Sequence, residues 1–304
     1  MGERSLRGSR HRPKRRIREA GTALAFLAPF LALLVVFQYV PMFDMVVSSL
    51  FRFNLFTPNQ RQFIGFGNYV RLIHDPGFAG SVRVSLTFLA AILLVQLPLG
   101  LGLAIAMNRS KRGIGLLRTA FFAPVVASSV VTAAIWRLLL DPANGLLNGV
   151  LGVFGLPPQG FITSQSEALP SIVLMTVWQQ IGLTMVLFLG GLQFIPQDIY
   201  DAASVDGTGH WQRFRYITWP LLRRTTAVVA VVTSITALQT FAPAFVLTQG
   251  GPNGSTSFLV YRIYTQAFSL LDPAYASAMS VALLAVVLFI SLLQMRVHRT
   301  EWTY

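Results

Sequence analysis

The chain has 304 residues, of which 54% are hydrophobic and only 12% are Asp, Glu, Lys or Arg. So few charged side chains cannot cover a water-facing surface of this size, and much of the surface must therefore face lipid. The formal net charge is +13. The sequence contains no cysteine, which excludes disulfides, thiolate metal sites and cysteine nucleophiles.

Six apolar runs have about the 20 residues that a helix needs to cross the hydrocarbon of a bilayer. They cover residues 20–40, 84–107, 119–140, 168–194, 225–247 and 274–295, and every acidic residue falls outside them. They predict an all-α bundle of six transmembrane helices over residues 20–295, between a basic tail (1–19) and a C-terminal tail (296–304). Pro98, Pro124 and Pro243 lie inside these runs and permit kinks. A shorter run, 146–156, cannot span and predicts a helix at the interface or packed on the bundle.

The basic residues are concentrated in the two tails and in every second connection between the apolar runs. Eight precede the first run, four lie between the second and third, four between the fourth and fifth, and two follow the sixth, which together make 18 of 24. Because Lys and Arg concentrate in cytoplasmic loops, both termini are predicted to be cytoplasmic. A cleaved signal peptide is the alternative for the first run, but its length and the five runs that follow favour a retained helix. The arginines flank apolar runs instead of forming one soluble patch, so no nucleic-acid partner is expected and the lipid bilayer is their expected neighbour.

The loop over residues 196–222 predicts a helix–turn–helix elbow on the cytoplasmic side. Asp198 is expected to cap a first short helix, and Asp206-Gly207 to break it, because glycine tolerates a positive φ. Thr208 is expected to cap a second helix that Pro220 separates from the next span. Such an elbow either docks into a groove of a partner protein or only joins two helices.

This loop resembles the "EAA" coupling loop of ABC importer permeases, whose pattern is roughly E-A-A-x-x-D-G-A, nine positions, then I-x-L-P. The chain departs from the pattern with Asp201 for Glu, Thr208 for Ala and Trp219 for Leu. The matching residues are Ala202, Ala203, Asp206, Gly207, Ile217 and Pro220. Similarity to the maltose and glycerol-3-phosphate type permeases of the carbohydrate-uptake family extends over residues 63–76, 135–148, 191–196 and 247–268. Pro243-Ala244 stands where many relatives carry Phe-Asp.

The resemblance implies the type I ABC importer permease architecture, in the bacterial inner membrane. The implied partners are a second permease subunit in a heterodimer, two ATPase subunits that carry ATP and Mg²⁺, and an extracytoplasmic solute-binding protein. The chain has no Gly-x-x-x-x-Gly-Lys-Ser/Thr loop, so it is expected to be no enzyme, with no catalytic residue, metal or cofactor of its own. The residues expected to couple to the ATPase are Asp201, Ala202, Ala203, Asp206, Gly207, Phe214, Ile217 and Pro220. Those expected to face the binding protein are Asn68, Tyr69, Gly250, Gly251 and Pro252.

Polar residues inside the spans are the candidates for the solute path, namely Trp178, Gln179, Gln180, Gln239 and Thr240. Amides beside an aromatic face suit a sugar or oligosaccharide, although each residue could equally join two helices. No cationic cluster lies deep in a span, which disfavours the alternative solutes glycerol-3-phosphate and glycerophosphodiesters; Arg137, near a span end, is the exception.

Two other classes of protein are disfavoured. A membrane enzyme would need paired acidic residues or histidines within a span. A stand-alone secondary transporter would lack the elbow and would usually carry an inverted repeat.

Overall fold

The computed structural model describes residues 13–56, 60–109 and 112–297, with side chains from Leu24 onward. These residues are mostly helical, and a two-residue antiparallel pair, β1 (Phe51–Arg52) with β2 (Gln62–Phe63), is the only sheet among them. The longer helices are α1 (Pro13–Leu34), α2 (Val40–Ser48), α3 (Gly67–His74), α4 (Pro76–Met107), α5 (Ile114–Val126), α6 (Ser129–Leu139), α7 (Leu146–Val153), α8 (Ala168–Gln193), α9 (Gln197–Val205), α12 (Arg223–Leu238) and α14 (Pro273–Val297). The short segments are η1 (Val35–Tyr39), η2 (Phe161–Thr163), α10 (His210–Arg213), η3 (Phe214–Thr218), α11 (Trp219–Leu221), η4 (Ala244–Thr248), α13 (Leu259–Tyr264) and η5 (Thr265–Ser269).

Among the described residues, four helical segments are long and apolar enough to cross a membrane, and two bent pairs bring the number to six if each pair is one span. The fourth and sixth predicted spans match α8 and α14 closely, and α4 starts earlier than predicted, at Pro76. The first apolar segment is longer than predicted: helix runs on through η1 into α2, and its apolar part covers Leu24–Ser48. Pro41 lacks an N–H, and the hydrogen-bond ladder shifts by one residue just before it, with Val40 N donating to Val35 O.

The expectation that every acidic residue lies in a tail or a loop is wrong at one position, because Asp44 lies inside α2, within the apolar helical segment Leu24–Ser48. Its carboxylate lies 3.9 Å from Arg61, and both side chains are exposed.

The third and fifth predicted spans are not single straight helices. α5 and α6 meet at 98° around an extended Ala127, just after Pro124, whose missing N–H weakens the helix there. The fifth run was expected to continue to Leu247, but α12 ends at Leu238 and the chain turns before η4. At its other end α12 bends by 66° from the α10–α11 segment that precedes it.

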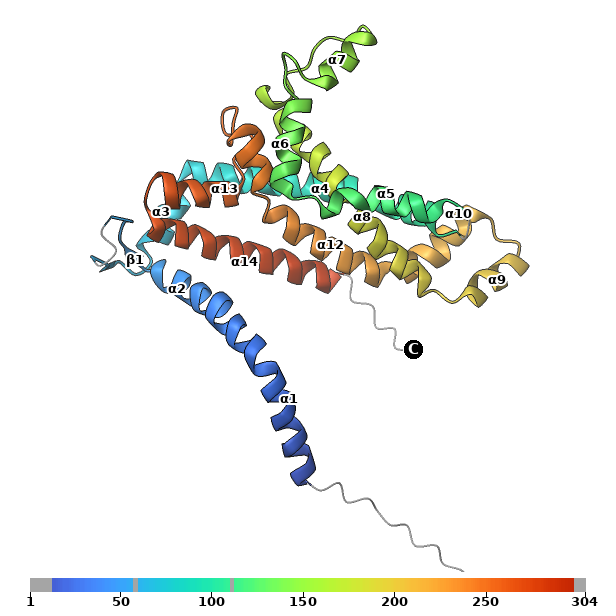
Figure 1. Ribbon diagram of the computed structural model, residues 1–304, viewed down its shortest axis with the longest axis horizontal. Helices are drawn as coiled ribbons and strands as arrows, with labels where there is room; N and C mark the ends of the chain where they lie inside the picture. The colour runs from blue at the N-terminus through green and yellow to red at the C-terminus, as the bar shows by residue number, and fades with distance from the viewer. Residues whose placement is uncertain (1–12, 57–59, 110–111, 298–304) are drawn as a thin grey trace, which may run out of the picture.

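The core of the bundle forms where α4, α8 and α12 pack together, with α5 against α8 and α14 against α12 (Figure 1). Two apolar clusters fill this core. One contains Phe88, Ile92, Ile172, Val177 and Leu238; the other contains Leu101, Met185, Phe188, Leu222 and Val229. α2 contacts α14, and α1 leads away from the bundle on its own, so that the most apolar part of this segment is not buried.

The short run near residue 150 does form a helix, α7, but this helix projects away from the bundle beyond α6 (Figure 1). The alternative that it packs on the bundle is therefore wrong. Residues 1–12 of the basic tail and residues 298–304 of the C-terminal tail lie outside the described residues, and the helix already begins at Pro13.

Candidate functional site: a polar layer between the spans and a protruding elbow

A layer of polar side chains separates the two apolar clusters of the core. Gln96 of α4 donates from Nε2 to Thr184 Oγ1 of α8 over 2.7 Å, and both residues are buried. They line a cavity of about 20 Å³ with Thr176, Gln180, Thr233 and Thr236. That volume is about enough for one water molecule. The Thr176 hydroxyl is buried and has no partner in the described part of the chain, so the layer retains unused hydrogen-bonding capacity.

The two predicted glutamines of α8 have different roles. Gln179 is 3% exposed, and its Nε2 donates to Ala127 O (3.0 Å) and Thr132 Oγ1 (3.3 Å). It therefore satisfies the carbonyl that the break between α5 and α6 leaves without a helical partner. Gln180 instead lines the polar cavity and is the better candidate for the solute path.

The other predicted path residues lie farther out. Trp178 is half exposed and packs against Trp136 of α6, with ring centroids 5.7 Å apart. Gln239 is exposed at the end of α12, and Thr240 Oγ1 donates to Thr236 O. The structure thus brings only Gln180 of the five into the polar layer. It adds Gln96, Thr176, Thr184, Thr233 and Thr236, which sequence reasoning missed.

The predicted elbow is present at one end of the bundle, where α9 protrudes (Figure 1). Gly207 has φ +71°, as expected for the Asp-Gly break. Both predicted N-caps are wrong, because α9 is preceded by Pro196 and α10 by Gly209. Asp198 lies instead in the first turn of α9, where its negative charge interacts favourably with the positive end of the helix dipole.

Thr208 closes the elbow instead of starting its second arm. Its hydroxyl donates to Ala203 O at the end of α9 (2.5 Å), and Arg213 Nε donates to Thr208 O (3.0 Å). Gly209, the residue before α10, donates from its backbone N to the side chain of Gln212, the third residue of that helix. The hydroxyls of Tyr200 and Thr218 lie 3.0 Å apart and also link the two arms.

The coupling residues divide between the surface and the inside of the elbow. Asp201, Ala202, Asp206 and Gly207 are exposed, whereas Ala203 is 5% exposed and faces the interior of the elbow. Phe214 packs against the cluster around Phe188, and Ile217 and Pro220 are partly buried. A large residue at Ala203 would therefore deform the elbow itself, and Ala202 is the small residue that another protein can reach.

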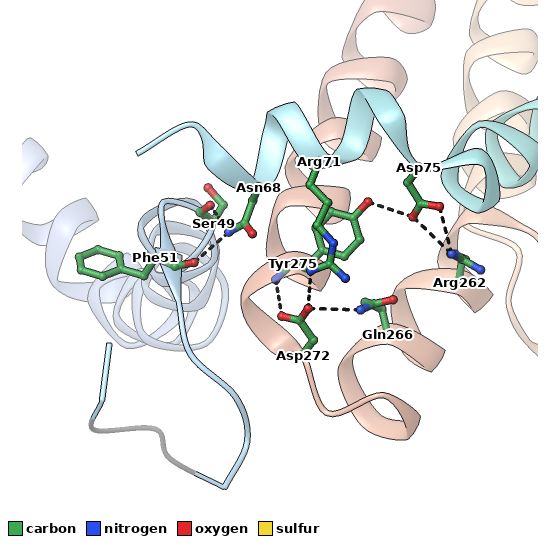
Figure 2. A network of polar contacts seen from close by, with 9 residues as sticks. All are labelled: Ser49, Phe51, Asn68, Arg71, Asp75, Arg262, Gln266, Asp272 and Tyr275. Atoms are coloured by element: carbon green, nitrogen blue, oxygen red, sulfur yellow. Dashed lines mark hydrogen bonds and ion pairs between the residues drawn. The ribbon is translucent and has the colours of Figure 1, made fainter. Parts of the chain in front are cut away.

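At the opposite end, a network of charged and polar residues joins four helices (Figure 2). Arg71 of α3 pairs with Asp272 (2.7 Å) and lies over the ring of Tyr275, 3.8 Å from its centroid. The Tyr275 hydroxyl donates to Asp75 (2.9 Å), which also pairs with Arg262 of α13 (3.3 Å). We call these five residues the Asp75 network. Its partners lie up to 201 residues apart, so sequence reasoning did not connect them.

Asp75 is the charge around which this network is built. Burial alone would raise the pKa of its carboxyl group. Hydrogen bonds from Tyr275 and from the backbone amides of Gly77 and Phe78, with the charge of Arg262, lower that pKa below its usual value. Asp75 therefore stays ionised at neutral pH and caps the start of α4 through Gly77 N.

The residues expected to face a binding protein lie near this end and are held firmly. Asn68 is buried and donates from Nδ2 to Ser49 O and Phe51 O, both at 2.8 Å, and the Tyr69 hydroxyl lies 2.7 Å from Ser49 Oγ. Asn68 therefore orders the loop from within and presents little surface of its own.

The Gly250-Gly251-Pro252 turn is also tightly built. Gly250 has φ +80° and lies against the ring of Tyr261. The Thr256 hydroxyl donates to Gly251 O (2.6 Å). These contacts fix the shape of the turn.

Comparisons with known proteins agree with this arrangement. The family model described as binding-protein-dependent transport system inner membrane component matches residues 96–300. The probable ABC transporter permease protein YurN of Bacillus subtilis is 34% identical, over 90% of this chain and 95% of its own length. The trehalose/maltose transport system permease protein MalF of Thermococcus litoralis is 32% identical, over 94% and 96%.

A crystal structure of a bacterial ABC transporter that imports the acidic polysaccharide alginate contains a chain with the same fold. The TM-score is 0.82 and the identity 23%, over 95% of this chain and 99% of that one. The fold, the elbow, the family match over two thirds of the sequence and the full-length relatives lead to one conclusion: the chain belongs to the family of inner membrane components of binding-protein-dependent transport systems, as the multi-pass permease subunit of an ABC importer.

Proposed function

We propose that the chain forms one half of the translocation path for a sugar or oligosaccharide. The observation that carries this proposal is the polar layer, in which amide and hydroxyl groups line a cavity between three spans. Uncharged donors and acceptors match the hydroxyl groups of a carbohydrate. The cavity of about 20 Å³ is far too small for a sugar, so the solute must sit between this layer and the second permease, in a state in which the spans separate. The relative named for trehalose and maltose supports this solute class.

Glycerol-3-phosphate and related phosphodiesters are the less favoured solutes. Their phosphate carries a charge that a buried site must neutralise with Arg, Lys or a metal ion. None of the described residues that line the cavity is charged. Arg137, the exception in the sequence, lies in the last turn of α6. It donates to the backbone oxygen of Val246 in η4 and does not line the cavity.

The elbow supports a docking role with a separate ATPase. Its tip is exposed and its small Ala202 is accessible. Because its two arms are linked by hydrogen bonds, a displacement of α9 by the ATPase would also move the bend that precedes α12. In this proposal the complex contains this chain, a second permease, two ATPase subunits that bind ATP and Mg²⁺, and an external binding protein that meets the loops near Tyr69 and Gly251. ATP drives transport because it binds one arrangement of the subunits more tightly than the other.

The basic loops orient the chain with both termini and the elbow in the cytoplasm. This orientation predicts that cysteine in place of Asp206, the one cysteine of the variant, is not labelled by a membrane-impermeant maleimide in intact cells and is labelled after permeabilisation. Ready labelling in intact cells would invert the proposed topology.

Gln180 and Gln179 give a matched test of the polar layer. We expect Gln180→Leu to lower sugar uptake by about 10- to 100-fold at normal abundance, because one or two buried hydrogen bonds to the solute are lost. Gln179→Leu should instead lower abundance, because it leaves the Ala127 carbonyl unsatisfied at a cost of about 1–3 kcal/mol. Uptake into proteoliposomes and the amount of folded protein separate the two effects. Full uptake by Gln180→Leu would remove this residue from the path.

A further inference from the structure

An apolar groove separates the last turns of α4 from the second arm of the elbow. Its volume is about 590 Å³. α4 contributes Leu97, Pro98, Leu101, Gly102 and Ile105; the remaining walls are Phe188, Trp211, Phe214, Arg215, Trp219 and Thr226. The groove is thus mostly apolar, and its polar groups are the Arg215 guanidinium, the Thr226 hydroxyl and the indole N–H groups of Trp211 and Trp219.

The position of the groove indicates which solvent reaches it. The α4 residues belong to the final three turns of a span that ends at Met107, on the side that carries most of the basic residues. The exposed tip of the elbow, α9, contributes no residue to the groove and lies beyond α10 (Figure 1). The groove therefore lies at the boundary of the cytoplasmic leaflet, where Trp side chains are favoured because one edge is apolar and the other polar.

Neither the Thr226 hydroxyl nor the Arg215 guanidinium has a hydrogen-bonding or ion-pair partner among the described residues. Thr226 is 8% exposed, and its hydroxyl oxygen is buried without a hydrogen-bond partner in the described part of the chain. Arg215 is exposed and forms no ion pair with any residue that the structure describes. A ligand that fits must therefore combine an apolar chain, a hydrogen-bond acceptor and a negative charge.

We propose that this groove binds an anionic phospholipid of the cytoplasmic leaflet. An acyl chain would lie against Leu97, Leu101 and Ile105, an ester carbonyl would accept from Thr226, and the phosphate would pair with Arg215. The acyl chain leaves one hydrocarbon environment for another, so its burial gives little selectivity. Selectivity comes from the headgroup, and one arginine near the surface favours an anionic lipid about fivefold.

A bound lipid would connect the membrane to the coupling elbow. It would contact α4 and the second arm of the elbow at the same time. The lipid would therefore fill the space between a membrane span and the element that transmits the movement of the ATPase. The second permease is the rival occupant of this groove, and the test distinguishes the two.

The test uses native mass spectrometry of the full chain in nanodiscs with equal amounts of phosphatidylglycerol and phosphatidylcholine. We expect the wild type to retain phosphatidylglycerol about fivefold over phosphatidylcholine. Arg215→Gln should remove this preference, whereas Arg223→Gln, a neighbouring arginine outside the groove, should keep it. Gly102→Leu should remove one retained lipid per chain by filling the groove.

The control for filling is Gly80→Leu on the same helix. Both glycines have open space where a Cβ would lie, and only Gly102 lines the groove. Equal retention of the two lipids by the wild type, or equal lipid counts in Gly102→Leu and Gly80→Leu, would overturn the proposal. So would loss of the retained lipid when the chain is measured in complex with its second permease, because the partner would then occupy the groove.

Discussion

Gly207→Val should weaken association of the chain with its ATPase by about thirtyfold while the chain still inserts into the membrane. Gly207 has φ +71°, where a β-branched residue is strongly disfavoured, at a cost of roughly 2 kcal/mol. The turn would relax to another conformation and move α9 relative to the second arm. A loss of about 2 kcal/mol corresponds to roughly thirtyfold in an association constant. The measurement is recovery of the ATPase by the tagged chain, with membrane abundance as the reference.

Gly209→Val is the matched control two residues away. Gly209 has φ −73° and ψ 165°, which valine adopts readily, and the nearest atom to an added Cβ is Gln212 Oε1 at 3.9 Å. This variant should recover the ATPase at the wild-type level. Equal recovery by both variants would mean that the turn does not position the docking surface.

The second large effect is expected at Gly182, where α8 crosses α5. An added Cβ would meet the backbone of Phe121 and Phe122, which cannot move without separating the two helices. Gly182→Leu should therefore destabilise the fold by about 3 kcal/mol. A quantitative blot of the membrane fraction and unfolding of the purified chain in SDS would measure this loss.

Gly190→Leu provides the comparison on the same helix. Apart from its chain neighbours and the backbone of its own helix, no described heavy atom lies within 4 Å of the position where its Cβ would be, so the same substitution should leave abundance near the wild-type level. If Gly182→Leu were as abundant and as stable as Gly190→Leu, α5 and α8 could not be in the close contact described.

The sequence predicted those helices whose position follows from the hydropathy of their own residues and not from contacts with distant ones. α8 and α14 are single uninterrupted apolar helices, so hydropathy located them to within one or two residues. The 98° bend between α5 and α6 was not predictable, although Pro124 marked its position. Its geometry depends on Gln179, which lies 52 residues away from the carbonyl that it satisfies.

The candidate site shows the same division. The positive φ of Gly207 was predictable because the adjacent residues Asp206-Gly207 favour such a turn by themselves, without contacts from elsewhere in the chain. Thr208 was assigned to the wrong end of the turn, because a threonine can satisfy either flank and only the folded elbow decides. The polar layer could not be predicted from the sequence, because Gln96 and Thr184 are 88 residues apart and neither belongs to a motif.

We propose that this chain is a permease through which a sugar moves at the expense of ATP hydrolysed by another subunit. The most direct measurement is uptake of a radiolabelled oligosaccharide by proteoliposomes that contain this chain, its second permease and the ATPase. We expect the sugar to accumulate only with ATP and Mg²⁺ on the side of the elbow and the binding protein on the opposite side. Uptake should be at most basal when either is omitted. Uptake at the full rate without the ATPase or without the binding protein would contradict it.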